Sequence, residues 1–279
     1  MVEEKFALIT GAGSGIGKEL ARELIRRKSN VALTDINGER LDEVAHELEK
    51  NKPKSSQRIE KFCLDHTKHE ENVALEKKYF GKFPRIDILC LNAGIGLGGD
   101  FLNHKLSDFH KLMDVNYFSN ISLLHSFLIH MQRQKSGKIL FTASIAGLLG
   151  LPMLSAYSAS KFAVVGLAES IRAELANDQI SVSVLCPGLV KTNIANDSAL
   201  RTTKEGDSTA KSNALEVYAK YGASAKQIAK DGINGMLKNQ DIITSPLSAT
   251  LMHSVKRASP TIFSMANQFF ANLSDKKLN

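Results

Sequence analysis

With 279 residues, the chain is long enough for one large domain or two small ones, and its formal net charge at pH 7 is +7. A hydrophobic content of 43% and a charged content of 23% are typical of a soluble globular protein. The basic residues are scattered and mixed with acidic ones, without the concentrated stripe of a nucleic-acid-binding surface. We therefore expect no nucleic-acid partner.

We expect neither a signal peptide nor a membrane span. The first residues, Met1 to Lys5, are too polar for a signal sequence, and no uninterrupted apolar run is long enough to cross a bilayer. Cys63, Cys90 and Cys186 each lie in an apolar, strand-like run. An odd number of cysteines in buried strands indicates reduced, structural thiols, so the sequence predicts a cytoplasmic location.

Short apolar strands alternate with amphipathic helices along the chain. The expected strands are residues 6–10, 30–35, 59–65, 86–92, 138–144 and 180–187, with a weaker one near 241–244. The helices are expected to begin near Gly15, Gly38, His69, Ser107, Ser155 and Ala225. This βαβ repetition predicts an α/β fold: a single-domain Rossmann fold, in which a doubly wound parallel sheet carries helices on both faces.

One domain over residues 1–279 is the economical interpretation, because no internal repeat and no low-complexity linker interrupts the pattern. Residues 195–215, which are mostly polar, are interpreted as a substrate-loop insertion that could act as a lid. Residues 245–279 form a variable C-terminal segment. Ligands of such sheets bind beyond the carboxyl ends of the strands, and the chemically suggestive residues of this chain follow those ends.

A glycine-rich run from Thr10 to Gly17 follows the first expected strand. Glycines at these positions allow a tight turn, let the backbone approach a pyrophosphate and let the next helix pack closely. The free N–H groups and the positive dipole end of that helix favour phosphate binding. The predicted dinucleotide-binding residues of this run are Gly11, Ser14, Gly15, Ile16 and Gly17.

An acid, Asp35, ends the second expected strand, as the dinucleotide fingerprint requires. Its carboxylate can accept hydrogen bonds from ribose hydroxyls, whereas a 2′-phosphate there would meet a like charge. The glycine-rich run has no Lys or Arg, and Ile36 follows the acid. The sequence therefore predicts NAD as the cofactor in preference to NADP. The alternative is that Asp35 only caps the following helix.

Tyr157 and Lys161 are four residues apart in a stretch with helical periodicity, so both side chains project from one helix face. A nearby ammonium favours the phenolate and lowers the pKa of a phenol. Such a pair suits one task, the transfer of a proton to or from an alcohol or carbonyl oxygen. The alternative is a surface helix that carries an ordinary Tyr and Lys at this spacing.

Taken in order and at these spacings, the motifs resemble those of the short-chain dehydrogenase/reductase family over residues 6–192. The Thr-Gly-x-x-x-Gly-x-Gly pattern and the Tyr-x-x-x-Lys pair are those described above, with Ser144 thirteen residues before the tyrosine. The remaining matches are the Asn-Ala-Gly of Asn92, Ala93 and Gly94, the Pro-Gly of Pro187 and Gly188, and Thr192.

The resemblance implies roles for four catalytic residues. Tyr157 would be the general acid/base, and Lys161 would lower its pKa and bind the nicotinamide ribose. Ser144 would hydrogen-bond the substrate oxygen. Asn116, within the long fourth helix, would hold a water in a proton relay to the lysine; a buried hydrogen-bonding role is its alternative, since Asn is a poor interior helix former.

The resemblance also implies cofactor contacts for Asp65 at the adenine, Asn92 at the sheet and Thr192 at the carboxamide. Further cofactor-binding residues are expected to be His66, Ala93, Gly94, Tyr157, Lys161, Pro187, Gly188 and Val190. His66 stands where the family usually has an apolar residue. With His69 it is better explained by a surface turn than by metal binding, and we expect no metal.

The expected substrate is apolar, with steroid-, retinoid- or lipid-like chemistry, because residues 145–154 are almost free of polar groups. The predicted substrate-binding residues are Ser144, Ile145, Leu151, Tyr157 and Leu189. The alternative is that this loop simply packs. Residues 250–273 could cover the pocket, join a subunit interface or touch a membrane surface; membrane contact is the option we expect least. The resemblance suggests a homodimer or homotetramer packed through the fourth and fifth helices.

The sequence thus predicts an oxidoreductase that catalyses reversible hydride transfer between NAD(H) and a secondary alcohol or ketone. Two other functions stay open. One is an NADPH-dependent carbonyl reductase, and the other is a catalytically silent dinucleotide-sensing regulator. The complete set of Asn116, Ser144, Tyr157 and Lys161 speaks against the regulator, because a sensor needs no acid/base.

Overall fold

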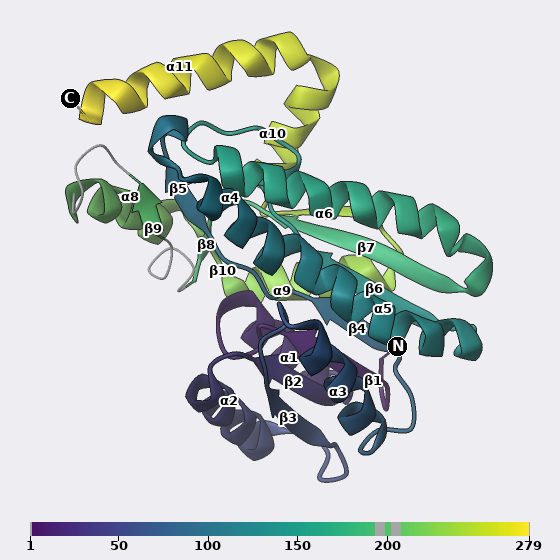
Figure 1. The fold of residues 1–279 in the computed structure, drawn as a ribbon. Coiled ribbons are helices and arrows are strands. Elements are labelled where there is room, and N and C mark those ends of the chain that lie inside the picture. The colour runs from purple at the N-terminus through teal and green to yellow at the C-terminus, as the bar shows by residue number, and fades with distance from the viewer. Residues whose placement is uncertain (1, 193–198, 202–207, 279) are drawn as a thin grey trace.

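The computed structural model describes residues 2–192, 199–201 and 208–278 of the chain. A seven-stranded sheet, whose neighbouring strands all pair in parallel, lies at its centre (Figure 1). From one edge to the other its strands are β11 (Ile242–Ser245), β7 (Ile180–Pro187), β6 (Gly137–Thr142), β4 (Ile88–Leu91), β1 (Phe6–Thr10), β2 (Asn30–Asp35) and β3 (Ile59–Cys63).

Helices cover both faces of the sheet. Those that contribute to the core of one face are α3 (His69–Phe80), α5 (Ser119–Gln134) and α6 (Ser155–Glu174). Those that contribute to the core of the other face are α1 (Gly15–Arg26), α2 (Gly38–Asn51) and α9 (Ala225–Leu237). The predicted doubly wound α/β fold is therefore confirmed.

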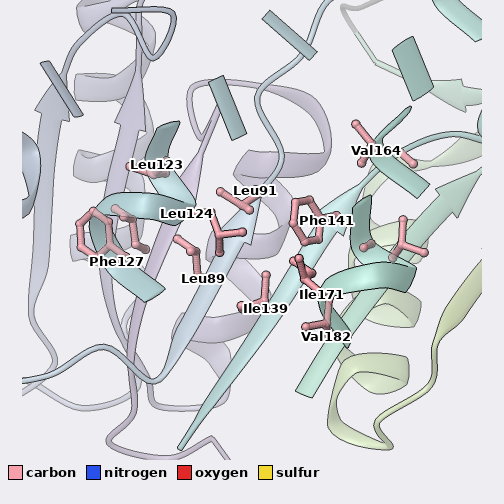
Figure 2. Close-up of a cluster of buried hydrophobic side chains, with 14 of the residues drawn as sticks. Leu89, Leu91, Leu123, Leu124, Phe127, Ile139, Phe141, Val164, Ile171 and Val182 are labelled. Carbon is pink, nitrogen blue, oxygen red and sulfur yellow. The ribbon is translucent and has the colours of Figure 1, made fainter. Parts of the chain in front are cut away.

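The two cores follow from the alternation of side chains along each strand. Leu89 and Leu91 of β4 point into the core shared with α3, α5 and α6, where Figure 2 shows them near Phe127 and Phe141. Ile88 and Cys90, the intervening residues, belong to the opposite core. A strand buried on both faces reads as a continuous apolar run, as this one does. Full burial of one such side chain contributes roughly 1.5–3 kcal/mol.

The order of the strands reverses between β1 and β4. From β1 the chain adds β2 and β3 on one side, and then crosses to β4, β6, β7 and β11 on the other. Parallel sheets leave a crevice beyond the carboxyl ends of the strands at such a switch point, where nucleotides bind. The glycine-rich run after β1 and the residues after β4 therefore meet at this crevice.

The expected long fourth helix is interrupted. It is divided into α4 (Leu106–Met113), a π-helical turn (Asp114–Phe118) and α5. A π turn inserts an additional residue into the helical repeat and redirects its side chains, and such turns are frequent at functional sites. Asn116 lies in the middle of this turn and is fully buried.

The region after β7 adds elements that the sequence did not predict. They are β8 (Val190–Lys191), which pairs with β10 (Ala223–Ser224), β9 (Ala199–Arg201), which pairs with β5 (Leu97–Gly99), and the helix α8 (Ser208–Tyr221). Of the expected lid at 195–215, residues 195–198 and 202–207 lie outside the described residues. The chain then forms α10 (Leu247–Ala258) and α11 (Pro260–Leu278), drawn yellow in Figure 1. No described helix is both long and apolar enough to span a bilayer.

Candidate active site

The glycine-rich run forms the turn between β1 and α1. Gly11 and Gly15 adopt φ angles of +63° and +52°, which side chains other than glycine rarely adopt. A Cβ on Gly17 would lie 2.1 Å from the carbonyl oxygen of Gly11, so α1 can approach this turn only without a side chain there. Ser14 is the N-cap of α1, and its side chain makes no cap hydrogen bond.

Asp35 lies beside the glycine-rich run. One carboxylate oxygen accepts the N–H of Gly13 at 2.9 Å, and the other accepts the N–H of Asn37 at 2.9 Å. The cap of α2 is Asn37, whose side chain accepts the N–H of Arg40, so the alternative that Asp35 only serves as the helix cap is wrong. The carboxylate instead ties the glycine-rich turn to the end of β2.

His66 is buried rather than in a surface turn. Its Nε2 lies 2.7 Å from the Thr34 hydroxyl, and its Nδ1 lies 2.7 Å from the Asn72 side-chain oxygen. Burial lowers the pKa of His66, although the Asn72 hydrogen bond acts the other way. The expected surface position is thus wrong for His66; His69 is exposed as expected, but it begins α3 and does not lie in a turn. The ring braces β2 against α3, beneath the predicted adenine pocket.

Asp65 follows β3, and its carboxylate accepts two hydrogen bonds from Thr67, from the backbone N–H at 3.0 Å and from the hydroxyl at 2.7 Å. Burial acts to raise the pKa of Asp65, but these two bonds outweigh it and lower the pKa. A charged, partly exposed carboxylate therefore stands at the end of β3. Among the residues that the structure describes, no group of three His, Cys, Asp or Glu side chains could hold a metal.

The Asn-Ala-Gly motif joins β4 to β1 at the switch point. The Thr10 hydroxyl accepts the N–H groups of Asn92 and Ala93 at 2.9 and 2.8 Å, and Asn92 Nδ2 donates to the Thr10 carbonyl at 3.1 Å. A Cβ on Gly94 would lie 3.0 Å from Asn116 Oδ1 and 3.2 Å from the Lys161 ammonium. The missing side chain at Gly94 is what lets these two groups converge.

The side chain of Asn116 makes three hydrogen bonds within the described part of the chain. Its Oδ1 accepts the N–H of Ile95 at 2.8 Å, and its Nδ2 donates to the Ile95 carbonyl at 3.1 Å and to the Ser160 hydroxyl at 3.0 Å. The buried hydrogen-bonding role that the sequence left open is therefore real. Any part in a proton relay comes in addition to it. Ser160 also donates to the Tyr157 carbonyl at 2.8 Å, which links the π turn to α6.

Tyr157, Lys161 and Ser144 converge at the carboxyl end of β6. Lys161 is 3% exposed, and its ammonium donates to the Thr142 carbonyl at 3.1 Å and lies 5.8 Å from the centre of the Tyr157 ring. The Ser144 hydroxyl accepts the N–H of Ala146 at 3.1 Å and hydrogen-bonds the Tyr157 phenol. The alternative of an ordinary surface helix is excluded by this burial.

The electrostatics of the pair differ from the prediction. Burial raises the pKa of Tyr157 to about 12, although the hydrogen bond from Ser144 acts to lower it. Burial lowers the pKa of Lys161 to about 8. The expectation that the ammonium brings the phenol toward neutrality is wrong here, because burial disfavours both charged forms and Lys161 bonds to the Thr142 carbonyl instead of the phenol.

Several predicted cofactor-binding residues follow β7. Thr192 lies against the glycine-rich run, because a Cβ on Gly15 would meet its methyl group at 3.2 Å. The Gly188 N–H donates to the Ser245 carbonyl at 2.8 Å, which joins the Pro-Gly turn to β11. Pro187 is the last residue of β7, and Val190 is buried in β8. These residues and the glycine-rich run thus face each other across the crevice.

The predicted substrate loop is divided between packing and exposure. Ile145 is buried in the core between β6 and α6, so for this residue the alternative of simple packing holds. Leu151 is partly buried against the same core, whereas Leu189 is 38% exposed. Two side chains that the sequence did not single out cover the loop from the C-terminal helices. Lys256 donates to the Leu148 carbonyl at 2.6 Å, and Asn267 donates to the Gly150 carbonyl at 2.8 Å.

The expectation that all three cysteines are buried holds for two of them. Cys90 and Cys186 are buried and free, as expected, but Cys63 is exposed at the edge strand β3. Cys186 accepts a hydrogen bond from the Ser144 backbone N–H, and burial raises the pKa of its thiol to about 12. A neutral thiol therefore supports the loop that carries Ser144. No sequence pattern pointed to this contact, which depends on the pairing of β6 with β7.

A family model described as short chain dehydrogenase matches residues 5–202. Dehydrogenase/reductase SDR family member 7B of Xenopus laevis is 30% identical over 259 residues, which cover 92% of this chain and 78% of that protein. Human dehydrogenase/reductase SDR family member 7 is 35% identical over 191 residues, which cover 68% of this chain and 56% of that protein.

Solved structures agree on the fold. A short-chain dehydrogenase/reductase from Burkholderia phymatum in complex with NAD superposes with a TM-score of 0.83 at 24% identity, over 94% of this chain and 95% of that one. A short-chain dehydrogenase from Sphingobium yanoikuyae in complex with NADPH superposes with a TM-score of 0.76 at 23% identity, over 93% of this chain and 95% of that one. The chain therefore belongs to the short-chain dehydrogenase/reductase family, oxidoreductases that bind a nicotinamide dinucleotide and a small-molecule substrate.

Proposed function

We propose that the protein catalyses reversible hydride transfer between NAD(H) and an apolar secondary alcohol or ketone. The observation that carries the proposal is the convergence of four groups at the switch point. Lys161 and Asn116 approach each other at Gly94, and the Ser144 hydroxyl bonds the Tyr157 phenol. Neither a packing role nor a role in cofactor binding alone accounts for a partly buried phenol that faces a serine hydroxyl.

The residues at the crevice fit a dinucleotide. The glycine-rich turn from Gly11 to Gly17 and the N-terminus of α1 would hold the pyrophosphate, and Asp35 would accept the ribose hydroxyls. Lys161 and Thr192 would hold the nicotinamide end. When bound, this cofactor supplies or accepts the hydride.

The protein's own groups would handle the proton. For reduction, the Tyr157 phenol gives its proton to the carbonyl oxygen while Ser144 donates a hydrogen bond to that same oxygen. A phenol with a pKa of about 12 is fully protonated at neutral pH, so it is ready to act as the acid. For oxidation the phenol oxygen must lose its proton. The phenolate can then take the proton of the substrate hydroxyl as the hydride leaves the same carbon. Lys161, with a pKa of about 8, can exchange a proton near neutrality, and Asn116 would hold the water that carries it onward.

Apolar groups around Tyr157 support an apolar substrate. Its ring packs beside a small cluster that is separate from the two main cores and comprises Leu97, Leu112 and Ala156, with Ile95 and Phe109 at its edge. A substrate carbon skeleton next to the phenol would therefore meet hydrocarbon, while its oxygen meets Ser144. We further propose a cytoplasmic location and a homodimer or homotetramer, the latter taken up at the scale of the whole molecule below.

The choice between NAD and NADP has one observation on each side. The Asp35 carboxylate bonds the turn that would hold the adenosine phosphate, which disfavours a 2′-phosphate. However, the side chain of Arg40 begins next to the same turn: a Cβ added to Gly13 would lie 3.2 Å from the Cβ of Arg40. The Arg40 guanidinium could attract a 2′-phosphate and so favour NADPH, which keeps the NADPH-dependent carbonyl reductase as the second candidate.

Calorimetric titration of the purified protein with NADH and, separately, NADPH tests the proposal. Tight NADH binding and weak NADPH binding are expected, and Asp35→Ala should lose that preference while Arg40→Ala keeps it. Preference for NADPH, lost in Arg40→Ala, would favour the second candidate. Binding of neither cofactor would overturn the enzyme reading. Hydride exchange from the preferred cofactor to any apolar ketone would eliminate the dinucleotide-sensing regulator.

A further inference from the structure

Apart from the crevice at the candidate active site, a pocket lies between the first turn of α6 and α11. Its volume is about 380 Å³, and its lining includes Leu151, Pro152, Ser155, Ser158, Asn267 and Ala271. Tyr157 belongs to the same helical turn but packs on the other side, against Leu97 and Leu112. The pocket is therefore distinct from the catalytic groups, and α11, drawn yellow in Figure 1, forms one of its walls.

Two serine hydroxyls at this pocket have no partner. Ser158 is 5% exposed, and its Oγ and that of Ser155 are both buried without a hydrogen-bond partner within the described ranges. Most buried polar side-chain atoms are hydrogen-bonded, because an unpaired one carries its full desolvation cost. Two such donors side by side therefore mark a place for the acceptor atoms of a ligand.

The start of α6 adds further donors. This helix has 20 residues, its N-cap Leu154 provides no side-chain cap, and its first turn holds no acidic residue. Its intrahelical hydrogen bonds begin with the N–H of Ser158, which donates to the Leu154 carbonyl at 2.6 Å. The backbone N–H groups before Ser158 and the positive end of the dipole favour a negative charge at this spot.

The remaining lining is uncharged and largely hydrocarbon. Leu151, Pro152 and Ala271 supply apolar walls, and among the described lining residues there is no Lys or Arg. Asn267 fixes α11 to the loop through its bond to the Gly150 carbonyl at 2.8 Å. A helix end and two hydroxyls without a side-chain cation suit a single negative charge better than a phosphate dianion. At about 30 Å³ per small group, the volume suits about a dozen non-hydrogen atoms.

We propose that this pocket binds a medium-chain carboxylate, with its carboxylate on Ser155, Ser158 and the start of α6 and its chain along Leu151 and Ala271. Because both hydroxyl oxygens are buried, the carboxylate reaches them through a small outward shift of residues 150–154. The proposal does not rest on the proposed hydride transfer, since the site involves neither the cofactor crevice nor the phenol.

Calorimetric titration of the full chain with sodium decanoate tests this site. One decanoate should bind per chain, and the double variant Ser155→Ala with Ser158→Ala should bind at least tenfold more weakly. Ser170→Ala is the matched control, since Ser170 lies on the same helix and its hydroxyl bonds the Gly166 carbonyl at 3.0 Å. Without ligand, the double variant should melt no lower than the unaltered protein, because the deleted hydroxyls have no partner to lose.

A second variant keeps the test decisive. Ala271→Phe, on α11, should fill the pocket and weaken decanoate binding without affecting NADH binding. Decanol should bind at least tenfold more weakly than decanoate, since it carries no charge for the helix end. Equal affinity of the serine variant, equal affinity of decanol, insensitivity to Ala271→Phe, or no binding at all would each overturn the proposal.

Discussion

At the scale of single residues, Lys161 carries a charge in a place that disfavours it. Its ammonium is almost completely buried, its one hydrogen bond from the side chain is to the Thr142 carbonyl, and burial lowers its pKa from 10.5 to about 8. That difference corresponds to roughly 3 kcal/mol against folding near pH 7. A lysine kept at such a cost is more typical of a functional position than of a packing one.

We expect Lys161→Met to stabilise the cofactor-free protein at pH 7 by about 2 kcal/mol, after about 1 kcal/mol is subtracted for the lost hydrogen bond. The unfolded chain holds more protons than the folded one between about pH 8 and 10.5, so the stability of the unaltered protein should rise with pH across that range. The stability gained in Lys161→Met should therefore shrink as the pH rises across the same range. Urea unfolding at pH 7 and pH 10 measures both effects, and a gain independent of pH would contradict this explanation.

Tyr157→Phe removes only the phenol oxygen from a packed ring. We expect kcat to fall by about a hundredfold to ten-thousandfold, the usual contribution of a general acid or base, while NADH affinity changes less than threefold. Tyr79→Phe is a matched control, because Tyr79 is buried in the core, far from the candidate site in sequence, and its hydroxyl bonds the Arg85 carbonyl. Steady-state rates with a reducible ketone and NADH titration are measured for both variants, and only Tyr157→Phe should lose activity. Unchanged kcat in Tyr157→Phe would remove the phenol from the mechanism.

At the scale of elements, the turn between β1 and α1 depends on one close approach. A Cβ on Gly17 would lie 2.1 Å from the Gly11 carbonyl oxygen, a backbone atom that cannot move without distorting the glycine-rich turn. A Cβ on Gly166, within α6, would meet nothing within 4 Å. Two glycines in helices thus differ only in what surrounds them.

We expect Gly17→Ala to lower NADH affinity at least tenfold and to destabilise the protein by about 1–3 kcal/mol, the usual cost of overpacking. Gly166→Ala should instead stabilise it by about 0.5–1 kcal/mol, because alanine restricts the unfolded chain and has the better helix propensity. Calorimetric titration and thermal unfolding of the two variants test the contrast. Equal effects would show that helix propensity, and not the approach of α1, governs both positions.

At the scale of the whole molecule, apolar side chains remain exposed on the helices expected to join subunits. Phe118, Ile129 and Phe162, in or beside α5 and α6, are 53%, 44% and 40% exposed. Leu102, on the connection before α4, is 91% exposed but belongs to a different region of the chain. Large exposed apolar patches mark interaction surfaces, so we expect these three side chains to meet a second subunit.

We expect Ile129→Glu to dissociate the proposed oligomer, because a charge buried in an apolar interface has no partner there. Leu102→Glu, a matched change at a more exposed leucine, should leave the oligomer intact. Light scattering after size exclusion gives the mass of each variant directly. A monomeric unaltered protein, or loss of the oligomer in Leu102→Glu alone, would contradict packing through α5.

Sequence alone determined the order of the central strands and of the helices that flank them, and it predicted the catalytic set that we propose. Continuous apolar runs mark strands buried on both faces, and the glycines, Asp35, Asn92 and the Tyr157–Lys161 pair are local patterns whose spacing carries their chemistry. These features depend on neighbours a few residues apart, or on the rule that places every strand end at one edge of the sheet.

Other properties of the protein depend on residues far apart in the chain. Burial from several elements, and not the adjacent lysine, sets the pKa of Tyr157, and it hides His66, which the sequence placed at the surface. The π turn at Asn116 and the contact between α11 and the loop near Gly150 likewise need partners dozens of residues away. Desolvation and long-range packing leave no periodic trace in a sequence, so these properties emerge only when the chain is folded.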